Sequence, residues 1–116
     1  MRRIVAVIAL GAAAVGCSTV DPTPKLKAAT AAIDAAKAAG AANFPASSDL
    51  IAKAEKYLGS AQAMIKDGNT KDAMRQLGLA SAAADDAKVT ATEATNVAKV
   101  KSLDAQIADL KTKLGM

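Results

Sequence analysis

The sequence has no histidine and no tryptophan, and it has only one cysteine, one tyrosine and one phenylalanine. Without histidine, the chain lacks the commonest general base and the commonest nitrogen ligand for metals. Asp85 and Asp86 are adjacent, and adjacent residues of a helix point about 100° apart, so we expect a solvent-exposed pair. The glycines are scattered and form no phosphate-binding loop. We therefore expect no catalytic residue, no metal site, no cofactor and no small-molecule substrate.

Aromatic and β-branched residues, which favour strands, are sparse, whereas alanine supplies 31 of the 116 residues. Alanine favours helices but buries only one methyl group, so the composition predicts an all-α fold with a thin core. Tyr57 falls on an apolar stripe and is expected to pack in that core. Beyond the first 16 residues, 13 basic residues face 11 acidic ones, a formal charge of about +2. No basic stripe with interleaved aromatics is present, so we expect no nucleic-acid partner.

The single cysteine follows an apolar segment near the start of the sequence. Met1-Arg2-Arg3 precedes the apolar residues 4–15, and small residues lead up to Cys17. This pattern is typical of a signal peptide, predicted here over residues 1–16. Twelve apolar residues form about 18 Å of helix, too short for a hydrocarbon core of about 30 Å. The alternative is an ordinary secreted protein that is cut near Ala14 and keeps one unpaired thiol.

Val15, Gly16 and Cys17 resemble the cleavage motif of bacterial lipoproteins, although Ala14 stands where that family usually has leucine. The resemblance implies that Cys17 carries lipid through its sulfur and attaches the protein to a lipid bilayer. In that family, aspartate after the cysteine retains the protein in the inner membrane. Because this chain has Ser18, the resemblance implies the outer membrane, facing the periplasm, in a host with two membranes.

Proline and turn signals divide the rest of the chain. Pro22 and Pro24 favour extended backbone, so residues 17–24 are predicted to be the lipidated cysteine and a tether. An alanine-rich helical domain is predicted over residues 25–116. Its expected helices span residues 25–42, 48–67 and 70–113.

Capping residues mark the boundaries of the second and third helices. Ser47 or Ser48 is expected to cap the second helix, and Thr70 the third. Gly68 is a turn signal between them. A connection this short makes the two helices an antiparallel hairpin within a three-helix arrangement.

The third helix carries two apolar seams that differ in phase. The first, which we call the alanine seam, comprises Ala73, Leu77, Ala80, Ala84, Ala87, Ala91, Ala94 and Ala98. The second, which we call the tail seam, comprises Val100, Leu103, Ile107, Leu110 and Leu114. Both have the heptad spacing of a coiled coil. A helix of about 65 Å is too long for the first two helices to cover. The tail seam is therefore predicted to bind a protein partner or a second copy, unless the tail folds back or frays.

Residues 26–98 resemble a family of alanine-rich bacterial envelope domains of unknown function. The matching residues are Ala39-Gly40-Ala41, Phe44-Pro45, Leu50, Ala54, Lys56, Leu58, Ala61, Gly68, Ala73, Leu77 and Asp86-Ala87. The resemblance implies a helical hairpin on a lipoprotein, without known chemistry. A weaker likeness, Cys17-Ser18 before a heptad helix, is to the small murein-type lipoproteins. The chain ends without the C-terminal lysine that this second family attaches to peptidoglycan.

These observations predict a membrane-anchored, non-enzymatic scaffold or protein-interaction module of the bacterial cell envelope. The alternative is an envelope-stabilising protein that binds the membrane surface or peptidoglycan through amphipathic helices. Lysines at positions 53, 56, 66 and 71 near the hairpin, and at 99, 101, 111 and 113 in the tail, would supply such contacts. A solvated lysine face is the simpler interpretation.

Overall fold

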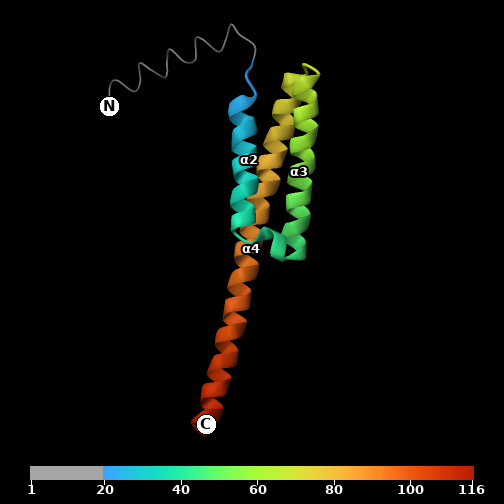
Figure 1. Ribbon diagram of the computed structural model, residues 1–116. Coiled ribbons are helices and arrows are strands. Elements are labelled where there is room, and N and C mark those ends of the chain that lie inside the picture. Colours follow the sequence, from blue (N-terminus) through green and yellow to red (C-terminus); the bar gives the residue numbers. More distant parts are fainter. Residues whose placement is uncertain (1–19) are drawn as a thin grey trace, which may run out of the picture.

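The computed structural model describes residues 20–116, and within them the fold is all-α. Its elements are α2 (Thr23–Ala38), the short 3-10 helix η1 (Ala41–Asn43), α3 (Pro45–Lys66) and α4 (Thr70–Lys113). The predicted fold class, a three-helix arrangement with a long C-terminal helix, is confirmed. The predicted signal peptide, Cys17 and the first residues of the tether lie outside the described residues. Figure 1 shows that α2 and α4 run in the same direction and α3 runs opposite to both.

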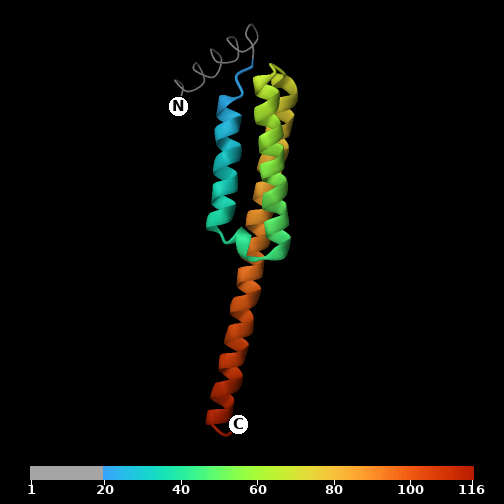
Figure 2. The same cartoon turned by 45° about the vertical axis from the view of Figure 1, so that its right-hand side comes forward.

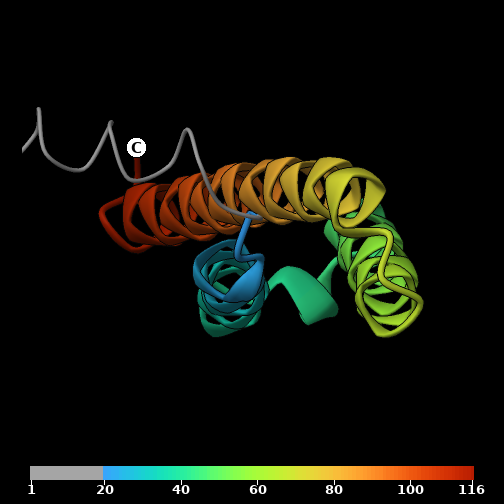
Figure 3. The same cartoon turned by 90° about the horizontal axis from the view of Figure 1, so that it is seen from above.

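The long helix α4 is the centre of the bundle. It packs against α3 along most of that helix and also against α2, whereas α2 and α3 contact each other little. Figure 2 shows α4 continuing well beyond the ends of its two neighbours. Seen from above in Figure 3, α2 and α3 lie on the same side of α4, and η1 bridges them. One face of α4 is therefore covered in the bundle, and the opposite face is left to solvent.

The core is thin because it is made of alanine. Eleven of the fourteen buried apolar residues of the described chain are alanine, and the others are Ile33, Ile51 and Leu77. Leu77 is the largest fully buried side chain there, and Ala29, Ala61, Ala73 and Ala80 surround it. Small side chains allow the helix backbones to approach closely, but each contributes little buried apolar area.

The first helix begins and ends earlier than the sequence predicted. It starts at Thr23 instead of residue 25, because a proline is tolerated in the first turn, where its missing N–H has no helical acceptor. The Asp21 carboxylate accepts the Thr23 N–H at 3.0 Å. The expected tether therefore loses its last two residues to α2. The helix ends at Ala38, because Gly40 adopts a left-handed conformation with φ of 89°.

The second helix begins at Pro45 and not at residue 48, so neither serine caps it. Proline fits the first helical position, where its fixed φ already matches the helix. Ser47 instead lies inside the first turn, fully buried. Its hydroxyl donates to the Ala41 carbonyl oxygen at 2.6 Å and lies 3.2 Å from that of Phe44. Ser47 thus ties η1 to the start of α3.

A three-residue turn connects α3 to α4. Gly68 has φ of 81°, and the Asn69 N–H donates to the Met64 carbonyl at 2.8 Å, which closes the end of α3. Asn69 occupies the capping position predicted for Thr70, and its side-chain amide donates to Asp72 at 2.9 Å. The turn makes α3 and α4 antiparallel, as the short connection predicts.

Candidate interaction surface

The alanine seam is covered only as far as the bundle reaches. Ala91 is the last buried residue of α4, Ala94 is half-buried and Ala98 is exposed. Within residues 20–116, no other element lies against α4 beyond this point (Figure 2). The last 20 or so residues of α4, which we call the tail, remain helical to Lys113. The structure thus shows a straight, uncovered tail and not one that folds back.

The tail seam is exposed along its whole length. Its exposed fractions run from 50% at Ile107 to 72% at Leu114. Val97 adds a sixth exposed apolar side chain at 55%, which the sequence analysis did not single out. Single exposed apolar residues are common, but a continuous row of large ones usually marks an interaction surface.

The two seams of α4 face nearly opposite directions. Ile107 follows Ala91 by sixteen residues, which at 100° per residue places it about 160° around the helix. The same offset relates Val100 to Ala84 and Leu103 to Ala87. The change of phase predicted from the sequence is therefore a half-turn of the apolar face, away from α2 and α3. A binding partner on the tail seam would meet neither helix.

Upstream, the face that continues the tail seam is polar. Val89 lies on it and is exposed by 57%, but the polar residues Glu93 and Asn96 separate it from the tail seam. These polar side chains break the row at the edge of the bundle. The continuous apolar surface is consequently confined to the tail.

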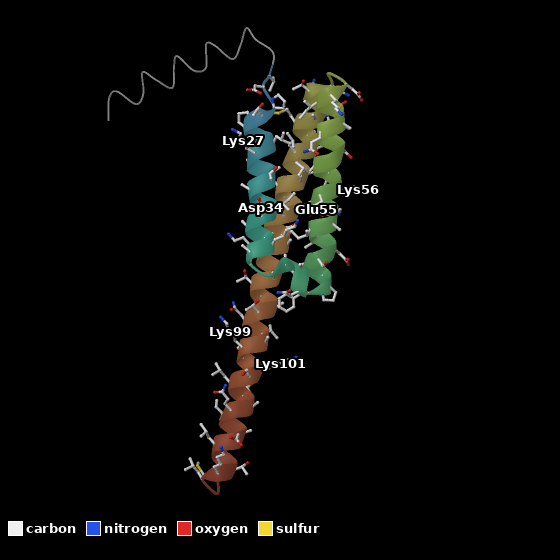
Figure 4. The ribbon with its side chains drawn as sticks, viewed as in Figure 1. Lys27, Asp34, Glu55, Lys56, Lys99 and Lys101 are labelled. Atoms are coloured by element: carbon white, nitrogen blue, oxygen red, sulfur yellow. The ribbon has the colours of Figure 1, made fainter. Side chains whose placement is uncertain are left out.

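Charged side chains flank the tail seam on both sides. Lys99 and Lys101 project from the tail below the bundle in Figure 4. Further along, Lys113 and Asp109 form an exposed ion pair at 3.1 Å, one turn apart on the same helix. The tail seam is therefore a narrow apolar stripe with charged edges, as in a coiled-coil helix.

The start of the described chain lies at the other end of the molecule. Val20 lines one surface hollow together with the α3–α4 turn, Gly68 to Lys71, and Met74. The tail projects from the opposite end of the bundle (Figure 1). The 44 residues of α4 extend about 66 Å between these two ends.

The other groups considered from the sequence are dispersed. Asp85 and Asp86 are exposed, and the described residues hold no group of three or more potential metal ligands. Tyr57 is half-buried against the core cluster around Leu77. Lys53 and Lys56 lie near the middle of α3 and not at the hairpin end, so the lysines do not gather in one patch there.

One ion pair links α2 to α3. The Lys37 ammonium lies 2.5 Å from the Glu55 carboxylate, and both side chains are about half exposed. The hydrogen bond to Glu55 raises the pKa of Lys37, and the charge of Glu55 acts in the same direction. Figure 4 shows Glu55 on α3 and Asp34 on the facing helix, α2. This pair connects two helices that otherwise touch little.

None of the described helices combines the length and the apolar character that crossing a membrane requires.

Comparison with protein-family models, with curated proteins and with solved structures finds no match to this chain. The resemblances to bacterial lipoproteins and to alanine-rich envelope domains therefore stay predictions.

Proposed function

We propose that this protein is a lipid-anchored, non-enzymatic scaffold of the bacterial cell envelope that binds a protein through its tail seam. The observation that carries the proposal is the exposed apolar row on a helix that leaves its own bundle. Helices in water bury such a stripe against a partner, because the hydrophobic effect disfavours leaving it in solvent. The bundle cannot serve as that partner, since it lies on the opposite face of α4.

The direction of the tail supports the anchored arrangement. Were Cys17 acylated, the α3–α4 turn would face the bilayer, and the tail would point away from it into the periplasm. Two or more acyl chains hold a protein firmly, because each buried methylene contributes about 0.8 kcal/mol. The bundle would then act as a spacer that holds the tail seam tens of ångströms from the lipid. In a host with two membranes, Ser18 favours the outer one.

The test is the native mass of the complete protein extracted from membranes in mild detergent. We expect the wild type to run as a complex larger than one chain. Leu103→Asp with Ile107→Asp should reduce it to a single chain, since both residues are exposed in the tail seam and their loss leaves the bundle intact. The matched control, Ala105→Asp with Thr112→Asp, puts the same charges on the opposite face of the tail and should change nothing.

Circular dichroism of both variants checks that the helices remain. If the wild type and the two double variants all run at the mass of one chain, or all remain in one complex, the tail seam is not the binding surface. Partners lost by the tail-seam variant alone are identified by mass spectrometry. To test the alternative, Cys17→Ser removes the acylated residue. Co-sedimentation of the Cys17→Ser protein with vesicles or wall sacculi would favour a lipid- or wall-binding role instead.

A further inference from the structure

We propose that the partner of the tail seam is the tail seam of a second copy, joined in parallel as a two-stranded coiled coil. This inference rests on the proposed function and names its partner. It is carried by three separate features of the tail: the shapes of the seam residues, the charges beside them, and the side on which the bundle lies.

The residue shapes favour two parallel strands. In heptad notation, Val100, Ile107 and Leu114 occupy a positions, and Leu103 and Leu110 occupy d positions. β-branched residues at a with leucine at d favour a parallel dimer, because of how each side chain enters the hole between four residues of the facing helix. The two complete heptads of the tail follow this pattern without exception. Leu114 begins the next heptad.

The flanking charges complement each other in the same orientation, and they disfavour one of the two antiparallel registers that have four layers. Lys99 is at a g position and Asp104 is at the following e position, five residues later. In a parallel pair, these two positions of opposite copies lie side by side. Each Lys99 therefore meets the Asp104 of the other copy, which gives two such pairs per dimer. An antiparallel pair that layers Leu103 on Ile107 instead brings Asp104 against Asp104, and Lys99 against Lys113. Its edges would carry like charges.

The bundle leaves room for the second copy. The tail seam lies about half a turn away from the alanine seam, so α2 and α3 lie behind each tail and not between the two. Two copies related by a two-fold axis along the tails would carry their bundles on opposite outer sides. Anchoring both copies at the α3–α4 turn end also points both tails the same way.

Single cysteines test the orientation in the complete, membrane-borne protein. Equivalent residues face each other in a parallel pair, so Leu103→Cys and Leu110→Cys should each form disulfide-linked dimers under mild oxidation. We expect at least a tenfold lower yield from Ala105→Cys, which lies on the far side of the tail, and from the wild type, which has only Cys17. Co-expressed Leu103→Cys and Ile107→Cys chains should yield homodimers. A predominance of mixed dimers would mean an antiparallel pair and would overturn the proposal.

Exchanging the charges of Lys99 and Asp104 tests whether these two residues pair across the dimer. Asp104→Lys places two lysines together at each edge and should lower the dimer yield from Leu103→Cys about fivefold. Lys99→Asp combined with Asp104→Lys should restore it. Failure of the double exchange to restore the yield contradicts the parallel pairing. A native mass of three chains would overturn the two-stranded state.

These results separate the two proposals. If no cysteine variant links to itself while the Leu103→Asp and Ile107→Asp variant still releases a different protein, the second copy is wrong and the scaffold role stands. If neither self-linking nor partner loss is seen, both proposals fail.

Discussion

Ser47 shows how much one hydroxyl contributes to a core built of alanine. It is the one polar residue that is fully buried among those described, and it joins the 3-10 turn to α3 through the Ala41 carbonyl. The sequence presents two adjacent serines before Asp49, and both are good helix caps. Ser47 is buried inside α3 because the helix begins at Pro45 and because η1 places the Ala41 carbonyl within reach of its hydroxyl. Capping preferences alone predict neither the start at Pro45 nor the position of η1.

Replacing Ser47 with alanine leaves the buried Ala41 carbonyl without this donor, so we expect the free energy of unfolding to fall by about 1–3 kcal/mol. Ser48→Ala is the matched control, because no hydrogen bond of its side chain is present in the described structure. It should change stability by less than about 0.5 kcal/mol. Urea denaturation followed by circular dichroism measures both. Equal effects of the two substitutions would argue against the role given to Ser47.

The Lys37–Glu55 ion pair should make the stability of the fold depend on pH in the alkaline range. Because Glu55 raises the pKa of Lys37 above its ordinary value of 10.5, the folded state holds this proton more tightly than the unfolded state. The ion pair therefore contributes to the free energy of unfolding below pH 10.5, and this contribution is lost as the pH rises through the raised pKa of Lys37. The difference in melting temperature between wild type and Glu55→Gln should be small at pH 7 and should disappear once the pH exceeds the raised pKa of Lys37. A difference that persists there would contradict this assignment.

At the scale of the helices, α4 was the most predictable element and α2 the least. Heptad repeats and a glycine turn mark the full span of α4, and the structure places it over the predicted residues 70–113. The predicted start of α2 is two residues too late, because proline breaks the interior of a helix but is accepted in its first turn. The side of α4 on which α2 packs could not be predicted. Alanine faces of similar size occur on every helix, so sequence patterns do not choose between them.

The two halves of the alanine seam should differ sharply in how far a larger side chain lowers the stability of the fold. Ala84 is fully buried where α4 meets the bundle, so Ala84→Leu should push the helices apart and cost about 1–3 kcal/mol. Ala98 lies on the same seam two heptads later, but it is exposed. Ala98→Leu should therefore change stability by less than about 0.5 kcal/mol. Thermal melts of the two variants make the comparison. Equal tolerance at both positions would mean that the bundle does not close over Ala84.

At the scale of the whole molecule, the bundle and the tail differ in which face of α4 is apolar. The bundle buries its own seam, and α4 carries a second seam out beyond it. Burying ten half-exposed tail-seam side chains in a dimer yields on the order of 10 kcal/mol, similar to the association cost of about 4–15 kcal/mol. Two heptads are thus marginal for free chains in dilute solution. Attachment to one membrane would raise the effective concentration and shift the balance toward association.

The sequence predicted the tail seam itself, since its residues and spacing are visible without coordinates. It did not show that α2 and α3 cover the alanine seam only as far as Ala91, nor that the tail leaves the bundle opposite to Val20. Both depend on which face of α4 the other helices choose. That arrangement also shows why Glu93 and Asn96 matter, because they separate the tail seam from Val89 at the edge of the bundle.

The most direct test of the account is photo-crosslinking of the complete protein in its native envelope. A photoreactive residue is placed at Leu110 in the tail seam, or at Ala105 on the opposite face of the same tail. We expect protein adducts from position 110 and few or none from position 105. The mass of the adduct shows whether the partner is a second copy. Equal adducts from both positions, or none from position 110, would contradict it.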